Sequence, residues 1–204
     1  MIKAALTLID RKGVKALTLR EIARQARVSH SAPYRHFKNK ADLLTAVAVQ
    51  GFDMLVSETR DRFTRIPDHP LFYFRESGLA YIDFAIAHSS HFRVMFGLGE
   101  DRKKKSDELR RASGDSFSIL LGSIEQCQAA GVVRAGDPRE LALSAWSIVH
   151  GFAMLYIEGY IKKFDEAENR RIKQMVVDSL YLGLQVMEEG GQAIPHGGCG
   201  VVMK

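Results

Sequence analysis

Apolar residues recur at intervals of three and four positions along nearly the whole chain, and no run alternates with a period of two for long. This spacing gathers the apolar side chains on one face of an α-helix, so the pattern predicts an all-α fold. Capping residues, glycines and prolines divide the chain into about nine helices. They are expected at residues 2–12, 19–26, a short stretch ending near 37, 39–66, 68–88, 90–96, 106–130, 137–163 and 166–189.

Several of these helix starts carry local capping signals. Thr18 is followed three positions later by Glu21, which forms a capping box, and Asn39 is followed in the same way by Asp42. At 137–140 an aspartate, a proline and an acid stand in the order that favours a helix start. The boundaries at these positions are therefore predicted from the sequence itself.

Charge divides the chain unevenly. The 204 residues hold 29 Lys and Arg against 24 Asp and Glu, for a net charge of +5. Residues 1–45 alone contain ten basic and three acidic residues, a net +7, and the rest of the chain sums to −2. A cationic module is therefore attached to a nearly neutral body, as is typical of proteins that bind nucleic acids.

The same counts define the expected domains. We expect a DNA-binding module at 1–45, a helical body at 46–189 and a mobile tail at 190–204, where five glycines and one proline occur. The first boundary falls inside the helix predicted at 39–66, which joins the two parts mechanically. No signal-peptide layout opens the chain, no uncharged apolar run is long enough to span a membrane, and two cysteines make no disulfide framework. We therefore expect a cytoplasmic protein.

Two short helices joined by a few residues have the layout of a helix-turn-helix. The second of them, ending near residue 37, presents hydrogen-bonding side chains of a size that fits the major groove of DNA. Basic residues surround it, as expected for groups that bind phosphates. The alternative remains that the motif is only structural, because the same geometry occurs in folds that never touch DNA. The residues in question are His30, Ser31, Tyr34, Arg35 and His36, with Arg20, Arg24, Arg27, Lys38 and Lys40 around them.

The stretch 17–44 resembles the DNA-binding domain of the TetR family of bacterial regulators. It matches the pattern xLTxxxIAxxAxVSxxxxYxHFxxKxxLL at about a dozen positions. Further along, the run Trp-Ser-Ile-Val-His-Gly at 146–151 resembles the WHG type of TetR ligand-binding domain, and His88 and the segment 92–96 fit that subgroup too. The resemblance implies a helix-turn-helix domain followed by a helical bundle that binds a ligand and dimerises.

The resemblance also assigns roles to residues of the first module. It implies phosphate contacts by Tyr34, His36 and Lys40, and base contacts at the start of the third helix. The alternatives are that Tyr34 packs against the fourth helix and that His36 is a cap or core histidine. Together with the basic residues, the expected DNA-binding set is Thr18, Arg20, Arg27, Ser29, His30, Ser31, Ala32, Tyr34, His36 and Lys40.

Two positions depart from the family pattern. Arg27 stands where the family usually has glycine in the turn, so a positive φ there would cost about 1 kcal/mol, which an arginine–phosphate contact could offset. The chain also begins almost inside the first helix, so no N-terminal arm is expected to contribute to DNA binding.

The last two long helices are apolar over more than one face, so each must bury a second surface. One interpretation is deep burial within the monomer. The other, implied by the resemblance, is a four-helix interface in a homodimer, which would present two reading modules to a palindromic operator. The expected interface residues are Ile148, Phe152, Leu155, Met175, Ser179, Leu180, Gly183 and Val186.

Aromatic and methionine residues are concentrated between the reading module and these helices. They form either an ordinary core or the walls of a pocket for a small apolar or aromatic effector. Tyr81, Trp146 and His150 are the expected polar contacts. The full candidate set for ligand binding is Tyr81, Phe84, Phe92, Met95, Phe96, Trp146, His150 and Met154.

We expect no catalytic site, no metal site and no cofactor. His88 and His91 stand three positions apart and could join His150 in a metal triad, but Ser89 and Ser90 are expected to interrupt the helix between them. The predicted function is that of a ligand-responsive, dimeric transcription repressor bound to the bacterial nucleoid. The alternatives are an activator or ligand-independent regulator of the same fold, or a helical binding or catalytic protein whose first module is only structural.

Overall fold

The computed structural model describes residues 1–97, 106–161 and 165–185. These ranges contain eight α-helices and one short 3-10 helix, and their only β-type pairing is an isolated bridge between Val133 and Gln185. The all-α prediction is therefore confirmed. In order, the elements are α1 (Ile2–Lys12), α2 (Leu19–Gln25), η1 (Pro33–Arg35), α3 (Lys40–Phe63), α4 (Pro70–Ala87), α5 (Ser89–Gly97), α6 (Asp107–Ala129), α7 (Pro138–Ile157) and α8 (Glu166–Leu184).

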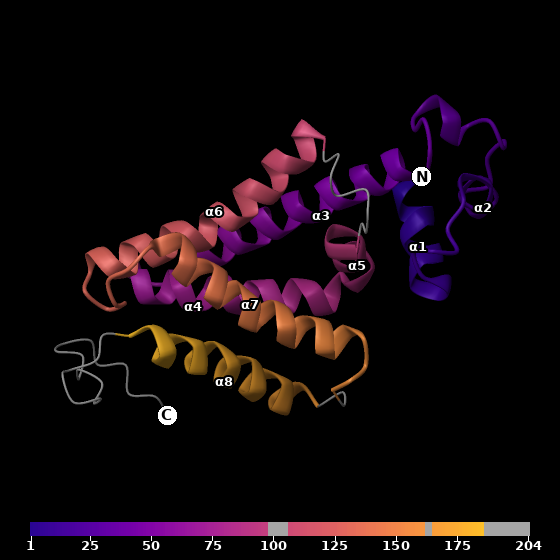
Figure 1. The fold of residues 1–204 in the computed structure, drawn as a ribbon. Helices are drawn as coiled ribbons and strands as arrows, with labels where there is room; N and C mark the ends of the chain where they lie inside the picture. Colours follow the sequence, from indigo (N-terminus) through magenta and orange to yellow (C-terminus); the bar gives the residue numbers. More distant parts are fainter. Residues whose placement is uncertain (98–105, 162–164, 186–204) are drawn as a thin grey trace.

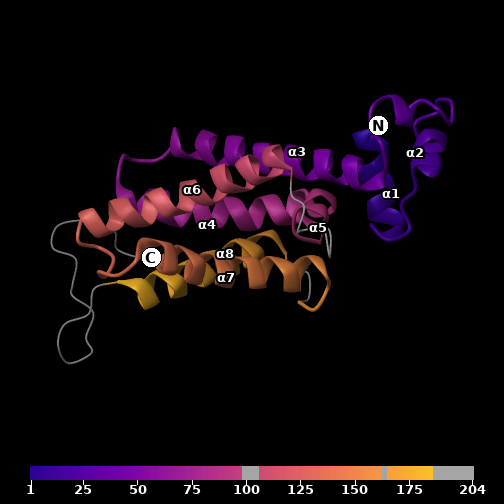
Figure 2. The ribbon, with the colours of Figure 1, turned by 45° about the horizontal axis from the view of Figure 1, so that its top comes forward.

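The molecule consists of a small head and an elongated body (Figure 1). The head contains α1, α2 and η1, and α3 starts at the head and runs on along the body. In the body α3, α4 and α6 pack together, and α7 and α8 lie side by side on the side opposite α3 (Figure 2). The short helix α5 contacts both α1 and α3, so it lies where the head meets the body.

One hydrophobic core connects the head to the body. It begins with residues of α1 such as Ala5 and Ile9, continues through Leu43 and Val47 of α3, and reaches Val177 of α8. A second core fills the far end of the body around residues of α4, α6, α7 and α8. Its fully buried members include Phe74, Ile124 and Ala142.

The predicted helix starts agree with the structure because their caps form. The Thr18 hydroxyl accepts from the backbone N–H of Glu21 over 3.2 Å, and the Asn39 side chain accepts from that of Asp42 over 2.9 Å. The side chain of Asp137 caps α7 in the same way. Each cap satisfies a donor that the first helical turn leaves without a backbone partner.

The third helix of the head differs from the predicted one in type and length. It is the three-residue 3-10 helix η1, in which Tyr34, Arg35 and His36 each donate to the carbonyl three residues earlier. Pro33 stands at the first position of η1, where its missing N–H is tolerated. With only three residues, η1 presents fewer side chains than the predicted helix would.

Helix α7 ends at Ile157, six residues before the predicted end at 163. Gly159 has a φ of 79°, and its N–H donates to the carbonyl of Tyr156. A glycine in this left-handed conformation terminates a helix and satisfies its last carbonyls. The predicted end of the last helix, near 189, lies outside the described residues.

Ion pairs tie the long helices of the body to one another. Asp83 of α4 accepts from Arg62 of α3 at 2.6 Å and also from Lys173 of α8. Arg75 of α4 pairs with Asp178 of α8 at 2.6 Å. All these side chains are partly shielded from solvent, so α4 is held between α3 and α8 by charge as well as by packing.

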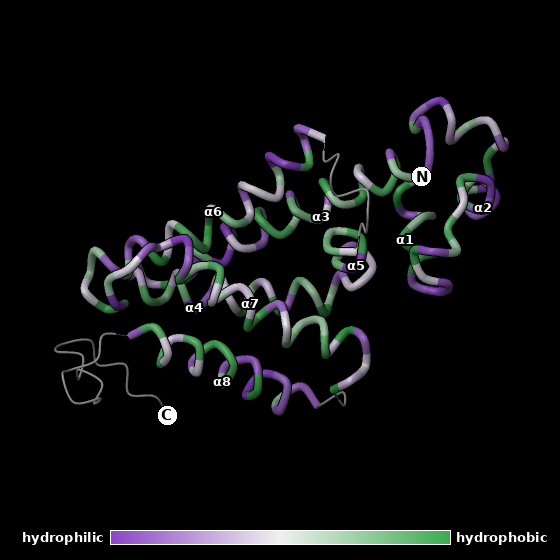
Figure 3. The backbone as a smooth tube through the Cα atoms, viewed as in Figure 1, coloured by the Kyte–Doolittle hydropathy of each residue, from purple (hydrophilic) through white to green (hydrophobic). Residues whose placement is uncertain are grey.

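Helix α7 is the most apolar of the long helices and is hydrophobic along most of its length (Figure 3). By length and composition alone it could cross a membrane, with a mean hydropathy of 1.3. One such helix is weak evidence, because core helices of soluble proteins pass the same test. Here α7 packs against α4, α6 and α8.

Candidate functional site

The head is a compact three-helix unit built around a few apolar side chains. Leu17, Leu19 and Ile22 are buried against residues of α1. At its surface Lys12 donates to a carboxylate oxygen of Glu21 over 3.0 Å and lowers the pKa of that glutamate. The unit therefore fixes α2 against α1 and leaves the segment 27–38 at the surface.

The residues expected to bind DNA lie on the surface of this unit. Tyr34 is 60% exposed, so it does not pack against α3 as the alternative interpretation required. His36 is exposed too and contacts the ring of Phe37, so it is not a core histidine, but it does occupy the C-cap position of η1. Ala32 and Lys40 are half-buried, and the exposed members of the set are Thr18, Arg20, Arg27, Ser29, His30, Ser31, Tyr34 and His36.

Arg27 occupies the turn between α2 and η1 with a φ of 55°. Among the described residues it is the only one other than glycine with a positive φ. An L-residue pays about 1–2 kcal/mol for this left-handed conformation. The strain expected from the arginine at this position is therefore present, and the side chain stays exposed to solvent.

A reciprocal cap fixes the point where the head enters α3. Asn39 caps the N–H of Asp42, and the carboxylate of Asp42 in turn accepts from the backbone N–H of Lys38 over 3.0 Å. Beside this cap, the ammonium of Lys40 donates to the carbonyl of Lys15 over 3.0 Å. The start of α3 is thereby tied to the loop between α1 and α2.

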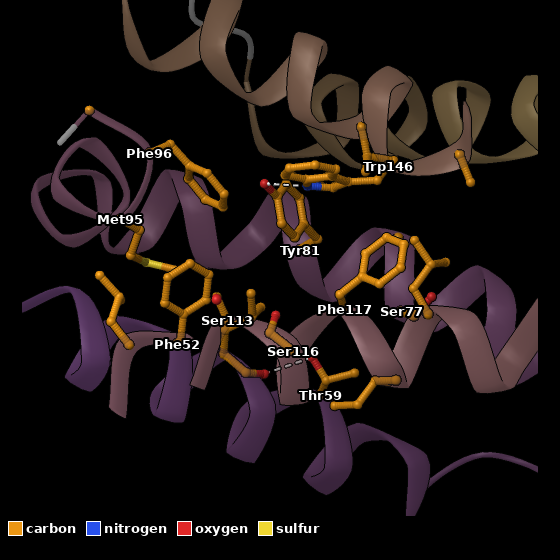
Figure 4. Close-up of a pocket in the computed structure, with 18 of the residues that line it drawn as sticks. Phe52, Thr59, Ser77, Tyr81, Met95, Phe96, Ser113, Ser116, Phe117 and Trp146 are labelled. Atoms are coloured by element: carbon orange, nitrogen blue, oxygen red, sulfur yellow. Dashed lines mark hydrogen bonds between the residues drawn. The ribbon is translucent and has the colours of Figure 1, made fainter. Parts of the chain in front are cut away.

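A cavity of about 690 Å³ lies between α3, α4, α5, α6, α7 and α8 and extends to the loop between α1 and α2. Known small-molecule sites commonly measure about 300–1,000 Å³. Its walls are mostly aliphatic and aromatic, with a few hydroxyl groups (Figure 4). The side chains labelled in that view are Phe52, Thr59, Ser77, Tyr81, Met95, Phe96, Ser113, Ser116, Phe117 and Trp146.

Three of the expected polar residues form a hydrogen-bonded group at the wall of the cavity. The indole N–H of Trp146 donates to the hydroxyl of Tyr81 over 2.9 Å, and that hydroxyl lies 2.7 Å from Nδ1 of His150. Since an indole can only donate, the hydroxyl of Tyr81 accepts from Trp146. Burial raises the pKa of Tyr81, so the phenol stays un-ionised. The rings, rather than the polar atoms, are left to face a ligand.

The candidate ligand-binding residues divide into two groups. Tyr81, Met95, Phe96 and Trp146 line the cavity. The other four do not, because they pack behind its wall or elsewhere. Phe84 and Phe92 are fully buried in the core, His150 lies behind Tyr81, and Met154 lines a smaller crevice between the head and the body.

Sequence reasoning missed the hydroxyl-bearing residues of the cavity. Thr59, Ser77 and Ser113 stand on the inward faces of α3, α4 and α6, where each hydroxyl donates to a carbonyl three or four residues earlier in its own helix. The sequence did carry a signal for these residues, because each is a small polar residue on an otherwise apolar helix face. Bonded in this way, they can lie in an apolar wall without leaving a donor unsatisfied.

The residues expected at a dimer interface are mainly exposed. Ile148 and Leu155 of α7 are 46% and 47% exposed, and Met175 of α8 is 52% exposed. Ser179 and Gly183 are exposed as well, and Phe152 is half-buried. Leu180 contradicts the expectation, since it is buried inside the monomer and lines the cavity. Val186 lies outside the described residues.

The histidines considered for a metal site have other partners. Nε2 of His88 lies 3.1 Å from a carboxylate oxygen of Glu58, and Nε2 of His91 lies 3.2 Å from the amide oxygen of Gln50. In the part of the chain that the structure describes, no group of three His, Cys, Asp or Glu side chains is placed to hold a metal ion.

Two family models match the chain, one over the head and the start of α3 and the other over the body. Residues 1–47 match the model described as "Bacterial regulatory proteins, tetR family", and residues 74–180 match "Tetracyclin repressor-like, C-terminal domain". The second match alone covers more than half of the chain. No curated protein sequence matches it significantly.

Solved structures with the same architecture span nearly the whole chain. A protein of unknown function from Rhodococcus sp. RHA1 is 28% identical, with a TM-score of 0.76 over 91% of this chain and 93% of that one. The TetR family transcriptional regulator PfmR from Thermus thermophilus is 17% identical, with a TM-score of 0.70 over 91% and 98%. A bacterial regulatory protein in the tetR family from Rhodococcus RHA1 is 20% identical, with a TM-score of 0.71 over 92% and 96%.

The helix-turn-helix head, the helical body behind it and the two family matches lead to the same assignment. This chain belongs to the TetR family of transcriptional regulators.

Proposed function

We propose that the protein is a homodimeric repressor that binds a palindromic operator on the bacterial nucleoid and releases it when a small apolar or aromatic molecule fills the cavity of the body. The observation that carries this proposal is the course of α3. Its first turn belongs to the head, and the helix lines the cavity from Lys40 as far as Thr59. One rigid element therefore contacts both the reading module and the ligand.

The surface of the head supports DNA binding. His30 and Ser31 are exposed on the segment that would enter the major groove, where side chains can discriminate base edges. Tyr34, His36 and Lys40 follow within ten residues and would bind the phosphate backbone, which fixes the register but carries no sequence information. The net charge of +7 over residues 1–45 matches such a partner.

The exposed apolar side chains of α7 and α8 support a dimer. Both helices lie together on one side of the body, and each leaves large apolar residues facing outward, among them Ile148 and Met175. A contiguous exposed apolar patch commonly marks a protein interface. A twofold dimer through these helices would place two heads on one side of a duplex, with half-sites about 34–36 Å apart.

Release by a ligand is a shift between two states of the body. An occupant that fits one arrangement of α3, α4 and α6 better than the other moves α3 and, with it, the head. The same fold could serve an activator, or a regulator that responds to no ligand. In the activator the occupied state would bind DNA, and in the ligand-independent regulator occupancy would leave DNA binding unchanged.

Selection of bound duplexes from a random pool tests the DNA-binding part. The full chain is expected to enrich a palindrome with two half-sites, and sedimentation is expected to show a dimer on the selected duplex. Tyr34→Phe should weaken binding to every duplex, whereas Arg60→Gln, a charge removal at the far end of α3, should not. Failure of the full chain to enrich any motif would rule out the proposal.

A panel of apolar compounds added to the complex with the selected duplex tests the ligand response. A compound that releases the wild-type protein should lose this effect on Trp146→Ala, which changes the cavity wall and leaves the head intact. Tighter binding in the presence of the compound would favour the activator.

A further inference from the structure

Charge is distributed very unevenly around the cavity. Among the described residues that line it, Lys15 and Lys40 are the only charged ones, and no acidic residue accompanies them. Neither lysine takes part in an ion pair within the described ranges. The ammonium of Lys40 donates one hydrogen bond, to the carbonyl of Lys15, and an ammonium has three donors.

The two lysines stand at one end of an elongated space. The residues of α3 that line the cavity extend from Lys40 to Thr59, which corresponds to roughly 28 Å along the helix axis. At the other end the wall is formed by apolar residues such as Phe74 and Leu180. The positive end therefore faces the head, and the apolar end lies deep in the body.

Beyond Lys15 and Lys40, the described residues that line the cavity carry no charged side chain. The hydroxyls of Thr59, Ser77 and Ser113 donate to carbonyls of their own helices. The indole N–H of Trp146 donates to the hydroxyl of Tyr81, and that hydroxyl is also hydrogen-bonded to His150. A charged group placed there would lose its hydration and meet hydroxyls such as that of Ser116 but no opposite charge, which disfavours binding.

We propose that this cavity binds an elongated apolar molecule with a single anionic group at one end, and that Lys15 and Lys40 hold that group. The apolar part extends along α3 toward Phe74. The proposal rests on the proposed function in one respect, that the cavity is the effector site. It adds the chemical class and the orientation of the effector.

Lys40 connects this site directly to the DNA-binding surface. The same ammonium is expected to contact a DNA phosphate, so an anion bound at Lys40 and a phosphate compete for one cation. The ligand would then weaken DNA binding in two ways, by moving α3 and by withdrawing a positive charge from the duplex. Loss of the contact between Lys40 and a DNA phosphate should lower the slope of log K for DNA binding against log salt concentration by about one.

Tryptophan fluorescence can test the proposal, because Trp146 is the only tryptophan of the chain and lies in the cavity wall. The full-length protein is titrated with dodecanoate, dodecan-1-ol and dodecyltrimethylammonium below their micellar concentrations. These probes share one alkyl chain and differ in the charge of the end group. We expect dodecanoate to bind about tenfold more tightly than the alcohol and the cationic probe to bind most weakly.

Variants of the two lysines locate the anionic group. Lys15→Gln and Lys40→Gln should each raise the Kd of dodecanoate and leave that of the alcohol unchanged. Lys38→Gln removes a neighbouring charge that does not line the cavity, and should preserve the preference for dodecanoate. Equal affinity for dodecanoate and the alcohol, or a preference that survives in both variants, would overturn the proposal.

The outcomes separate this proposal from the proposed function. If a palindrome is enriched but the three probes bind alike, the anionic effector is wrong and the regulator stands. If dodecanoate is preferred through Lys15 and Lys40 but no duplex is enriched, the cavity assignment stands and DNA regulation is wrong.

Discussion

The hydroxyl of Tyr81 in α4 lies 2.7 Å from Nδ1 of His150 in α7 and also accepts a hydrogen bond from the indole N–H of Trp146. The phenol thus bridges two residues one helical turn apart. Tyr81→Phe leaves both partners buried or half-buried without this bond, so the free energy of unfolding should fall by about 1–3 kcal/mol. Urea denaturation measures the change.

Tyr73 provides the matched control for this variant. Its hydroxyl donates to Asp68 over 2.9 Å at the surface, where water can replace it. Tyr73→Phe should therefore cost clearly less than Tyr81→Phe. Equal losses would mean that the group around Tyr81 contributes nothing beyond a surface hydrogen bond.

Two substitutions at Arg27 can distinguish the effect of its charge from the effect of its strained backbone. Arg27→Gln keeps a side chain at the φ of 55° and removes the charge, whereas Arg27→Gly removes both the charge and the strain. We expect the glycine variant alone to gain stability, by up to about 1 kcal/mol. Thermal unfolding of the two variants in parallel gives the comparison.

The two Arg27 variants differ in stability but should behave alike in DNA binding. If Arg27 contacts a phosphate, both variants lose affinity for all duplexes and lower the salt slope by about one. An unchanged slope in Arg27→Gln would remove this arginine from the interface.

The exposed face of α7 predicts how the dimer can be broken. Ile148→Asp would bury an unpaired carboxylate between the two copies, and the dimer dissociation constant should rise about 100-fold. Sedimentation velocity over a range of concentrations measures it. Ser118→Asp adds the same charge to the exposed surface of α6 and should leave the dimer intact. A dimer that tolerates Ile148→Asp must use another surface.

His91 makes stability depend on pH. Burial and the neighbouring His88 lower the pKa of His91 below its ordinary value of 6.5, so the unfolded chain binds this proton more readily than the folded one. Stability is therefore full above about pH 6.5 and is lost as the pH falls through the lowered pKa. The free energy of unfolding should fall from about pH 7 to about pH 5.

His91→Gln should make that pH dependence shallower, because glutamine can still bond to Gln50 and does not titrate. Other groups facing this position, His88 and Glu58, remain in the variant. Identical slopes in the wild type and His91→Gln would exclude His91 as the group responsible.

Local signals predicted the helix starts correctly. Features that depend on long-range packing could not be predicted in the same way. A cap such as Thr18 or Asn39 requires only residues three positions away, so it can be identified in the sequence. The conformation of Arg27 was predictable for a similar reason, since the family pattern has glycine there. The end of α7 near Gly159 was missed because a glycine alone does not mark a helix end, and Gly151 lies inside the same helix without ending it.

The sequence allowed a prediction that the body holds an apolar, aromatic cavity, but not of which residues line it. Tyr81, Trp146 and His150 were expected together, yet whether each faces the space or packs behind it depends on how α4 and α7 rotate against each other. The packing of the body helices as a whole buries Phe84 and Phe92 and brings Thr59 and Ser113 to the surface of the cavity. Helical periodicity identifies an inward face but cannot distinguish a packed core from a lined space.

Two hydrogen bonds join the head directly to the first turn of α3, because the Asn39 side chain accepts from the N–H of Asp42 and the Asp42 carboxylate accepts from the N–H of Lys38. The helix has 24 residues and is therefore about 36 Å long. A tilt of about 5° about its far end would displace the head by about 3 Å, close to the rise of one base pair, about 3.4 Å. A small change in the shape of the cavity can therefore leave the fold unchanged. It is still large enough to move a head out of register with its DNA half-site.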